Sequence, residues 1–530
     1  MSPLEEKAGS LSRDEIVALL MSQEKLTARI GELERQLEWF QRQVFGSKSE
    51  RRILSPDGRQ LGLGEQLGTT MPAAVTDETV RSYVRRRRTD PLEGASDDSG
   101  LRFDPSVPVR EIQIPNPEIA DLPPESYTVV GKKETCRLAQ EPGAYVVLRY
   151  VREVVKLKKE GTFSCPPAPP SVLEKSFADV SLLAGILLDK FLFYLPLYRQ
   201  HQRLAASGIH LGRSTLTQWV HAVIALLEPI YLAQWQSVLS SSVLVMDETP
   251  VKAGRVQPRG RSPGKMKTGF FWPILGDHDE VLFPFSPTRA HAVVEQLLGE
   301  FKGTLLSDGY EAYSRFAAKV EGLVHALCWS HLRRYFIDSE QMEPSLSTKA
   351  LEHIGALYAH EATIRERGLD GEKKLEYRGT HCKPVVDDFF VWLRQAHEKH
   401  LLLPTSPFTK AANYGLERED GLRVFLQNPE VPVDTNHLER QVRPVAMGRR
   451  NWLFCSTEVG AKYVGIIHSL LATCRLQKVD PYSYLVDVLQ RIETHPARDV
   501  HLLTPRLWKQ HFAADPLRSD LDRIRQRSVA

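Results

Sequence analysis

Residues 242–247 read SVLVMD, a run of four apolar residues that ends in an aspartate. A second short run, GTLLSD at residues 303–308, ends in the same way. Short apolar runs bounded by polar residues are typical of strands buried inside a sheet. An acidic residue at the end of such a strand is costly unless it binds water or a metal ion. The two runs therefore predict buried strands that present Asp247 and Asp308 at their ends.

The chain around these two runs alternates between strand and helix patterns. Residues 269–275, 281–285 and 320–327 are expected to be further strands, and residues 290–298 a helix. This order predicts an α/β sheet with mixed strand directions. Residues 252–267 are expected to be a loop, which holds no acidic residue and six basic ones: Lys252, Arg255, Arg259, Arg261, Lys265 and Lys267.

A third acidic residue is expected to join the two aspartates, because two carboxylates are too few to hold two Mg²⁺ ions, which need oxygen ligands. The candidate is Glu439, within DTNHLERQVRPVAMGRRNWLF at residues 434–454. Asp434 or Thr435 is expected to cap a helix there. No acidic residue follows Glu439 before Glu458, whereas four arginines do: Arg440, Arg443, Arg449 and Arg450. Such a separation of basic from acidic residues is expected if phosphate groups approach the site.

The N-terminal part of the chain carries a heptad pattern over residues 16–44. Its two apolar rows are Ile16, Gln23, Ile30, Leu37, Val44 and Leu19, Leu26, Leu33, Phe40. Such rows favour a parallel two-stranded coiled coil, and the alternative is a helix packed on its own protein. We expect a coiled coil at residues 12–45 that makes a homodimer or higher oligomer. Residues 46–100, with four arginines at 85–88, are expected to be a flexible basic linker.

Two smaller regions precede the expected sheet. In residues 101–170 the segment YVVLRYVREVVKLK is rich in β-branched residues and predicts a strand pair. In residues 171–235 two expected helices flank the turn SGIHLG, which is the outline of a helix-turn-helix. No acidic residue lies between 190 and 227, where the basic residues are Lys190, Arg199, Arg203 and Arg213. An ordinary helical hairpin is the alternative, but the missing acids favour a DNA-binding region.

The composition excludes several classes of protein. The 530 residues hold 69 Lys+Arg and 66 Asp+Glu, and 42% are hydrophobic, which excludes wholesale disorder. Six cysteines are too few for a disulfide framework. Apolar runs such as residues 181–188 and 466–472 fall short of the roughly 20 residues that a membrane span needs. With no signal peptide visible, we expect a cytoplasmic, nucleoid-associated protein without a membrane partner.

Several motifs together resemble the large transposase of the insertion-sequence-66 group, the TnpC-type proteins. They are FGSKSERR, LPLYRQHQRLAASGIHLGRSTLTQWV, VLVMDETPVK, LLSDGYEAY, CWSHLRRYF, NHLERQVRPVAMGRRNWLF and LLATCRLQKVDPYSYLVDVL. The resemblance implies a DDE recombinase whose α/β catalytic core, a ribonuclease-H-like mixed sheet with helices, spans residues 236–465. It also implies a helical insertion at about 337–430 and a C-terminal helical domain at 466–530. Matched residue by residue, the catalytic triad falls on Asp247, Asp308 and Glu439.

The resemblance also implies a chemistry. The three acids would hold two Mg²⁺ (or Mn²⁺) ions for in-line phosphoryl transfer, in which water first frees a 3′-hydroxyl that then attacks target DNA. The implied partners are double-stranded DNA, as terminal inverted repeats and as target, and small companion proteins of the same element. The expected DNA contacts are Arg199, Arg203, Arg213, Lys252, Arg255, Arg259, Arg261, Lys265, Lys267, Arg440, Arg443, Arg449 and Arg450. The alternatives are a diverged relic that binds DNA without cutting, and a ribonuclease-H-like nuclease without strand transfer.

The chain departs from the family in one module. Members carry a small zinc-binding module with paired cysteines, whereas residues 101–170 hold only Cys136 and Cys165. A tetrahedral zinc site needs four nitrogen or sulfur ligands. We therefore expect a degenerate zinc-ribbon-like module that keeps its strands and has lost its zinc. Cys328 and His331 form a CxxH pair, which we interpret as structural rather than as metal ligands.

Overall fold

The computed structural model describes residues 101–530 except 142–143, 160, 175, 256–264, 400–402, 453–454 and 530. The coiled coil expected at 12–45 and the linker expected at 46–100 lie outside the described residues. Residues 101–340 and 345–530 belong to one compact unit, which holds every strand and helix named below except the first residue of α9.

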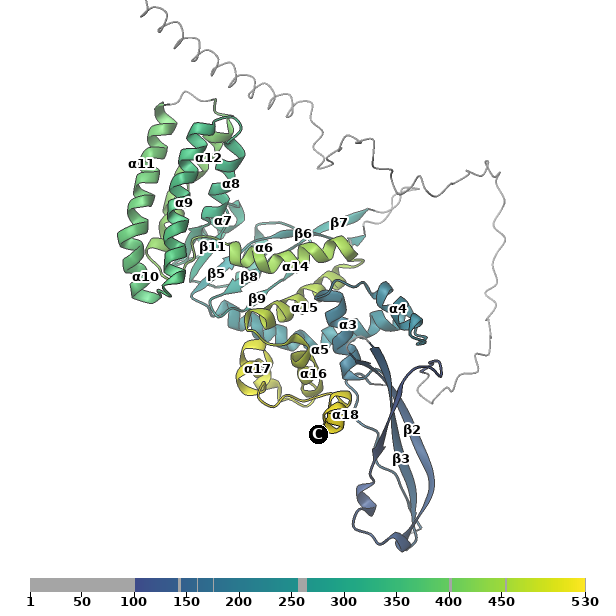
Figure 1. Ribbon diagram of the computed structural model, residues 1–530. Coiled ribbons are helices and arrows are strands. Elements are labelled where there is room, and N and C mark those ends of the chain that lie inside the picture. The colour runs from purple at the N-terminus through teal and green to yellow at the C-terminus, as the bar shows by residue number, and fades with distance from the viewer. Residues whose placement is uncertain are drawn as a thin grey trace, which may run out of the picture. The chain divides into compact units, whose positions relative to one another are not determined.

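A five-stranded sheet lies at the centre of the unit, with the strand order β12-β11-β5-β8-β9 (Figure 1). Strand β11 pairs in parallel with both β5 and β12, whereas β8 is antiparallel to β5 and to β9. The expected α/β sheet with mixed strand directions is therefore confirmed. The strands are β5 (Val243–Met246), β8 (Ile274–Gly276), β9 (Val281–Leu282), β11 (Thr304–Ser307) and β12 (Val324–Leu327).

A second sheet has the order β10-β7-β6 and is made of β6 (Thr249–Arg255), β7 (Met266–Phe271) and β10 (Phe285–Ser286). The expectation of a loop over residues 252–267 is thus wrong at both ends, where the chain forms an antiparallel strand pair. Buried Val251 and Ala253 alternate with exposed Lys252 in β6. The alternation is that of a half-buried strand, but the basic side chains on its outer face gave it the composition of a loop.

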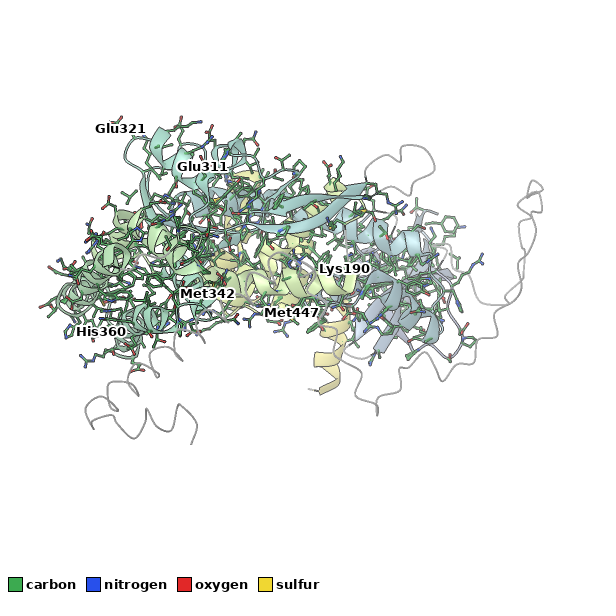
Figure 2. All side chains as sticks on the ribbon, turned by 90° about the horizontal axis from the view of Figure 1, so that it is seen from above. Lys190, Glu311, Glu321, Met342, His360 and Met447 are labelled. Carbon is green, nitrogen blue, oxygen red and sulfur yellow. The ribbon has the colours of Figure 1, made fainter. Side chains whose placement is uncertain are left out.

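Helices α6 (Ala292–Leu298) and α7 (Glu311–Lys319) connect the strands and pack against each other. Helix α15 (Glu458–Leu476) packs on β9 and on α5 (Arg213–Leu239), which also contacts β8 and β9. Helix α14 (Asn436–Trp452) precedes α15 along the chain (Figure 1). Seen from above, Met447 of α14 lies between Lys190 and His360 (Figure 2).

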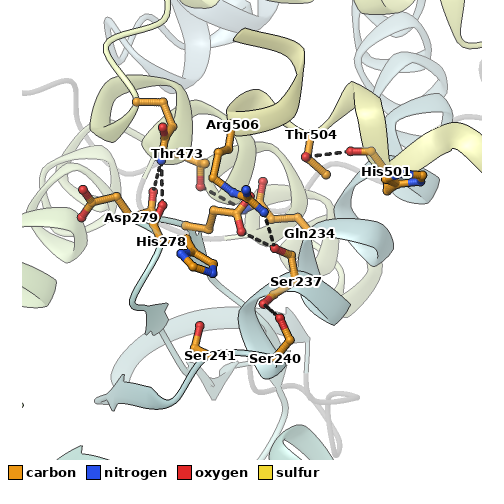
Figure 3. A network of polar contacts seen from close by, with 12 residues as sticks. Gln234, Ser237, Ser240, Ser241, His278, Asp279, Thr473, His501, Thr504 and Arg506 are labelled. Atoms are coloured by element: carbon orange, nitrogen blue, oxygen red, sulfur yellow. Dashed lines mark hydrogen bonds and ion pairs between the residues drawn. The ribbon is translucent and has the colours of Figure 1, made fainter. Parts of the chain in front are cut away.

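A buried polar network joins α5, the turn before β9 and the C-terminal helices (Figure 3). The Gln234 amide donates to the Val281 carbonyl and to the Thr473 hydroxyl, both at 2.9 Å. Arg506 donates to the Ser237 hydroxyl at 3.1 Å and pairs with Glu280, whose side chain is 1% exposed, at 3.2 Å. Because buried polar groups are costly when unpaired, this network fixes the C-terminal helices against the sheet.

Most of the described residues between 329 and 423 are helical, and this stretch lies between β12 and α14 in the chain. A buried ion pair holds them together, since Arg378 bonds Glu361 at 2.8 Å and the carbonyls of Phe425 and Val431 at 2.7 and 3.0 Å. The helices are α8 (Trp329–Ser339), α9 (Pro344–Glu366), α10 (Gly371–Tyr377), η3 (Arg378–Cys382), α11 (Lys383–Lys399), α12 (Pro407–Leu416) and α13 (Glu419–Arg423). The stretch expected as an insertion is helical over most of its length.

The N-terminal part of the unit is a β-rich module. Its four-stranded sheet has the order β1-β3-β2, with β4 paired to β3. Cys136 is buried within β2, and Cys165 directly follows β4. The strands are β1 (Val109–Ile114), β2 (Tyr127–Glu141), β3 (Ala144–Leu157) and β4 (Phe163–Ser164).

Helices α3 (Val180–Phe191) and α4 (Leu197–Ala206) lead from this module to α5. The C-terminal helices are α16 (Pro481–Arg491), α17 (Pro505–His511) and α18 (Asp520–Val529). The Tyr150 hydroxyl of β3 donates to Asp520 at 2.8 Å, so the N-terminal module and the C-terminal helix are in contact.

Helix α5 corrects the expectation that no apolar segment approaches the length of a membrane span. Within the described part of the chain it is the one helix long and apolar enough to cross a membrane. It nevertheless contacts α3, α15 and two strands of the central sheet. It also contains Pro229 and the hydrogen-bonded Gln234. This packing is that of a helix in a protein core.

Candidate active site

Asp247 and Asp308 follow the last residues of two parallel neighbouring strands, β5 and β11. Leu306 pairs in register with Val245, and each aspartate lies two residues beyond its member of this pair. The Asp247 amide donates to the Pro273 carbonyl at 3.2 Å, and the Asp308 carboxylate accepts from the Tyr310 amide at 2.9 Å. The sheet register therefore brings these two predicted site residues together at one edge.

The electrostatics of Asp247 reflect this crowding. Burial raises the pKa of Asp247 to about 7, and the nearby carboxylates of Glu248 and Asp308 act in the same direction. The Glu248 amide donates to the Asp247 carboxylate at 2.7 Å, which favours the charged form but does not outweigh burial. A buried carboxyl with a raised pKa beside other carboxyls is a candidate functional-site residue.

Glu248 is a site residue that the sequence reasoning missed. Its side chain is only 4% exposed and accepts a hydrogen bond from the Tyr313 hydroxyl at 2.7 Å. It also pairs with Arg289. Burial raises the pKa of Glu248. The signal available in the sequence was its position next to Asp247, in the motif DETP.

Cys328 and His331 link the sheet edge to the helical region. The Cys328 amide donates to the Ser307 carbonyl at 3.1 Å, and its sulfur lies 2.9 Å from the Ser330 hydroxyl. Burial lowers the pKa of His331, but the Cys328 thiol and the two aspartates outweigh burial and raise it overall. His331 therefore belongs to the electrostatic environment of Asp247 and Asp308.

Glu439 lies in the first turn of α14. The Asp434 carboxylate accepts from the Asn436 amide at 3.0 Å, at the start of the helix. The amides of Trp329 and Thr435 bond the Val433 carbonyl (3.1 Å) and the Cys328 sulfur (3.3 Å) respectively, which fixes this start beside the end of β12.

Glu439 is partly exposed and lies beside an arginine. Its side chain is 34% exposed and lies 3.8 Å from the Arg334 guanidinium. Over the described ranges, no three His, Cys, Asp or Glu side chains form a group that could hold a metal ion. The structure thus brings Asp247 and Asp308 together, and among the described residues it forms no three-ligand group with Glu439.

The predicted basic residues near the site fall into two sets. Lys252 and Arg255 of β6 and Lys265 and Lys267 beside or within β7 are exposed, as are Arg440 and Arg443 of α14. Lys252 donates to Thr268 at 2.6 Å and Lys267 pairs with Glu458 at 3.0 Å. Arg449 is engaged within the protein, where it donates to the Pro250 carbonyl. Arg259, Arg261 and the side chain of Arg450 lie outside the described residues.

The basic residues of the helical region also divide. Arg199 and Arg213 are exposed, and the Arg213 guanidinium lies over the Tyr198 ring. Arg203 instead pairs with Asp189 and donates to the Tyr145 hydroxyl at 2.7 Å. Asp189 lies one residue before the acid-free stretch, so a count within that stretch could not reveal the partner of Arg203.

A family profile described as "Transposase IS66 family" matches residues 175–463. Profiles described as "IS66 C-terminal element" and "Transposase C of IS166 homeodomain" match residues 469–505 and 32–95.

Curated relatives include two proteins of Sinorhizobium fredii (strain NBRC 101917 / NGR234), uncharacterized proteins y4hP and y4jD. Both are 29% identical to this chain, over 91% and 92% of it and over 89% and 96% of their own lengths. A solved structure, the Drosophila P element transposase strand transfer complex, matches with a TM-score of 0.29 and 12% identity, covering 55% of this chain and 92% of that one. By the family profile, which spans more than half of its residues, the chain belongs to the IS66 family of transposases.

Proposed function

We propose that the chain cleaves DNA at the ends of its insertion sequence and joins the freed 3′-hydroxyls to target DNA. The observation that carries this proposal is the pair Asp247 and Asp308, side by side at the ends of two parallel strands. The family membership supplies the reaction class. The sheet order β9-β8-β5-β11-β12, with β8 antiparallel to its neighbours, supports a ribonuclease-H-like core.

The donor set of the two aspartates fits Mg²⁺ or Mn²⁺. Hard divalent cations take oxygen ligands, and Asp247, Asp308 and Glu248 are three carboxyls whose charges act on one another. Asp247 and Asp308 would hold the metal, and Glu439 is the candidate third ligand. Bound metal would polarise the scissile phosphate and lower the pKa of an attacking water. Glu248 is already engaged with Arg289 and Tyr313, so we assign it to positioning Asp247.

The basic strands β6 and β7 are the candidate path for DNA phosphates. Lys252, Arg255 and Lys265 are exposed on or beside these strands, which directly follow Asp247 in the chain. Arg440 and Arg443 extend the positive charge past Glu439. Phosphate contacts of this kind position a duplex without reading its sequence. The terminal repeats and the target DNA would both have to reach this surface.

The decisive experiment uses DNA that carries the inverted repeats flanking the coding region. Purified protein with Mg²⁺ or Mn²⁺ is expected to nick the repeat ends and to leave 3′-hydroxyls. Asp247→Asn is expected to abolish nicking, and the matched control Asp515→Asn, at an exposed position of the C-terminal region, to leave it unchanged. Nicking that survives in Asp247→Asn protein would overturn the assignment of the site.

A second function is favoured by the position of Glu439. Because Glu439 pairs with Arg334 and stands outside the aspartate pair, the chain could be a relic that binds DNA without cutting it. Binding to the terminal repeats without metal-dependent nicking would support the relic. Nicking without the joining of ends to a target would instead indicate a nuclease.

Three associated expectations stay predictions. Elemental analysis of the purified protein is expected to find no stoichiometric zinc. Light scattering is expected to give a dimer or higher oligomer, which deletion of residues 12–45 would reduce to a monomer. The need for small companion proteins can be tested by comparing transposition with and without the other reading frames of the element.

A further inference from the structure

A pocket of about 470 Å³ lies where α8, α9 and the start of α14 meet. Its volume is within the range of roughly 300–1,000 Å³ typical of small-ligand sites. The expected catalytic residues do not line it. The lining residues are Ser330, Arg333, Arg334 and Ile337 of α8, Gly355 and Tyr358 of α9, and Asn436 of α14.

The pocket adjoins the candidate active site. Arg334, which lines it, lies 3.8 Å from the Glu439 carboxylate. Ser330 also lines it and contacts Cys328, which follows the strand next to that of Asp308. A ligand in the pocket would therefore lie one side chain away from Glu439.

The lining combines positive charge with apolar and aromatic surface. Arg333 and Arg334 are exposed, and none of the described residues that line the pocket is acidic. Guanidinium groups bind phosphate through paired, charge-assisted hydrogen bonds. Ile337 is 38% exposed, and Tyr358 offers an aromatic ring. Apolar and aromatic side chains of this kind stack on nucleobases.

Gly355 keeps the pocket open. It lies in the interior of α9, where glycine costs about 1 kcal/mol relative to alanine. A Cβ atom placed on Gly355 would meet no other atom within 4 Å. Helix stability and local packing therefore both allow a larger residue, and the missing side chain leaves volume for a ligand.

We propose that this pocket binds one unpaired nucleotide of the DNA strand that reaches the active site. Its phosphate would lie on Arg333 and Arg334, and its base against Ile337 and Tyr358, over Gly355. A base that is paired and stacked in a duplex cannot enter such a pocket, so the nucleotide must be extruded or single-stranded. The proposal rests on the proposed function in one respect, that DNA is the substrate.

The test fills the pocket without touching the catalytic residues. Gly355→Leu adds a side chain into open space and improves helix propensity, so its melting temperature should equal or exceed that of the wild type. The matched control is Gly379→Leu in η3, where a Cβ atom also meets nothing within 4 Å. Gly379 does not line the pocket.

Binding is measured by fluorescence anisotropy in metal-free buffer. One labelled probe is a short duplex with a single-stranded extension, and the other is the blunt duplex of the same sequence. Wild type should prefer the extended duplex. Gly355→Leu should weaken binding of the extended duplex by about tenfold or more, as expected from loss of one stacked base, and should leave binding of the blunt duplex unchanged. The control variant Gly379→Leu should bind both probes as wild type does.

Arg333→Gln supplies a second, electrostatic readout. Arg333 is chosen over Arg334 because Arg334 pairs with Glu439. For the extended duplex, this change should lower the slope of log affinity against log salt by about one. An equal fall in slope for the blunt duplex would make Arg333 an ordinary surface contact and would overturn the pocket assignment.

Failure of this proposal is distinguishable from failure of the proposed function. If wild type nicks repeat ends but Gly355→Leu prefers the extended duplex as strongly as wild type does, the pocket assignment is wrong and the function stands. If the extended duplex is preferred through Gly355 and Arg333 but no metal-dependent nicking occurs, the pocket stands and the proposed cleavage fails.

Discussion

The two aspartates and the glutamate of the candidate site are held in different ways. Asp247 and Asp308 follow buried parallel strands whose register fixes them side by side. Glu439 lies on the first turn of α14, 34% exposed and beside Arg334. Paired strands hold their carboxylates in fixed positions before a ligand binds. A carboxylate on an exposed helix can instead change its interaction partner. We therefore expect substitutions in the two regions to differ in their effects on metal binding, on DNA cleavage and on the pH dependence of stability.

The largest expected effect is a difference between the two regions in how substitutions change metal binding and DNA cleavage. Asp247→Asn and Asp308→Asn should each lower nicking of repeat ends by about a thousandfold or more, since metal catalysis contributes several kcal/mol. Both changes should also abolish Mn²⁺ binding measured by calorimetry. Glu439→Gln should lower nicking severely but leave one Mn²⁺ bound at the aspartate pair. Complete loss of Mn²⁺ binding in Glu439→Gln would show that the glutamate is as integral to the site as the aspartates.

The next effect concerns the stability of the metal-free protein. Asp247 has a pKa raised to about 7 in the folded state, against an ordinary value of 3.8. The stability associated with its neutral form is therefore complete below about pH 4 and is lost as pH rises through about 7. Asp247→Asn cannot ionise, so at pH 8 it should exceed wild type in unfolding free energy by a few kcal/mol at most, at about 1.4 kcal/mol per pKa unit.

Denaturant unfolding in the presence of a chelator measures this difference. Glu439→Gln should unfold like wild type at both pH 5 and pH 8. A stabilising effect of Glu439→Gln as large as that of Asp247→Asn would contradict the contrast between the buried pair and the exposed helix.

The difference between the two regions also sets what could be predicted from sequence. Asp247 and Asp308 could be found because each ends a short apolar run, which is a local signal. The position of Glu439 could not, because it depends on how the helices between β12 and α14 return the chain to Cys328, through the bonds of Trp329 to Val433 and of Thr435 to Cys328. These contacts join residues about a hundred positions apart and leave no periodic pattern.

Charge patterns in the sequence also give an incomplete prediction of structure, for a related reason. Residues 252–267 are expected to be a loop because of their basic composition, although parts of both strands lie in this range and Val251 and Ala253 of β6 are buried on either side of Lys252. Arg203 is expected to contact DNA, and in the structure its partly exposed guanidinium also pairs with Asp189 and bonds the Tyr145 hydroxyl. Composition shows which charges are present in a stretch, whereas folding decides which of them have partners within the protein.

A smaller effect is the pH dependence of metal affinity. Protons and metal compete for a carboxylate, so below about pH 7 Mn²⁺ affinity at the aspartate pair should fall, by up to about tenfold per pH unit, as Asp247 becomes protonated. Asp308→Glu would keep a negative charge beside Asp247, so the pH midpoint of Mn²⁺ affinity should stay unchanged. Removal of that neighbour by Asp308→Asn should lower the pKa of Asp247, which can be followed by carboxyl NMR. A metal affinity that is flat between pH 5 and pH 8 would mean that Asp247 is already ionised.

The smallest expected effect concerns the basic side chains on α14 rather than Glu439. Arg443 is exposed on the helix that carries Glu439, and Arg498 is exposed in the C-terminal region. Arg443→Gln should weaken duplex binding at low salt and lower the salt slope by about one, because one phosphate contact is lost. Arg498→Gln removes the same charge at a distant position and should leave the slope unchanged. Equal slopes for both variants would mean that only net charge attracts the DNA, and would contradict the proposal that α14 contacts DNA beside Asp247 and Asp308.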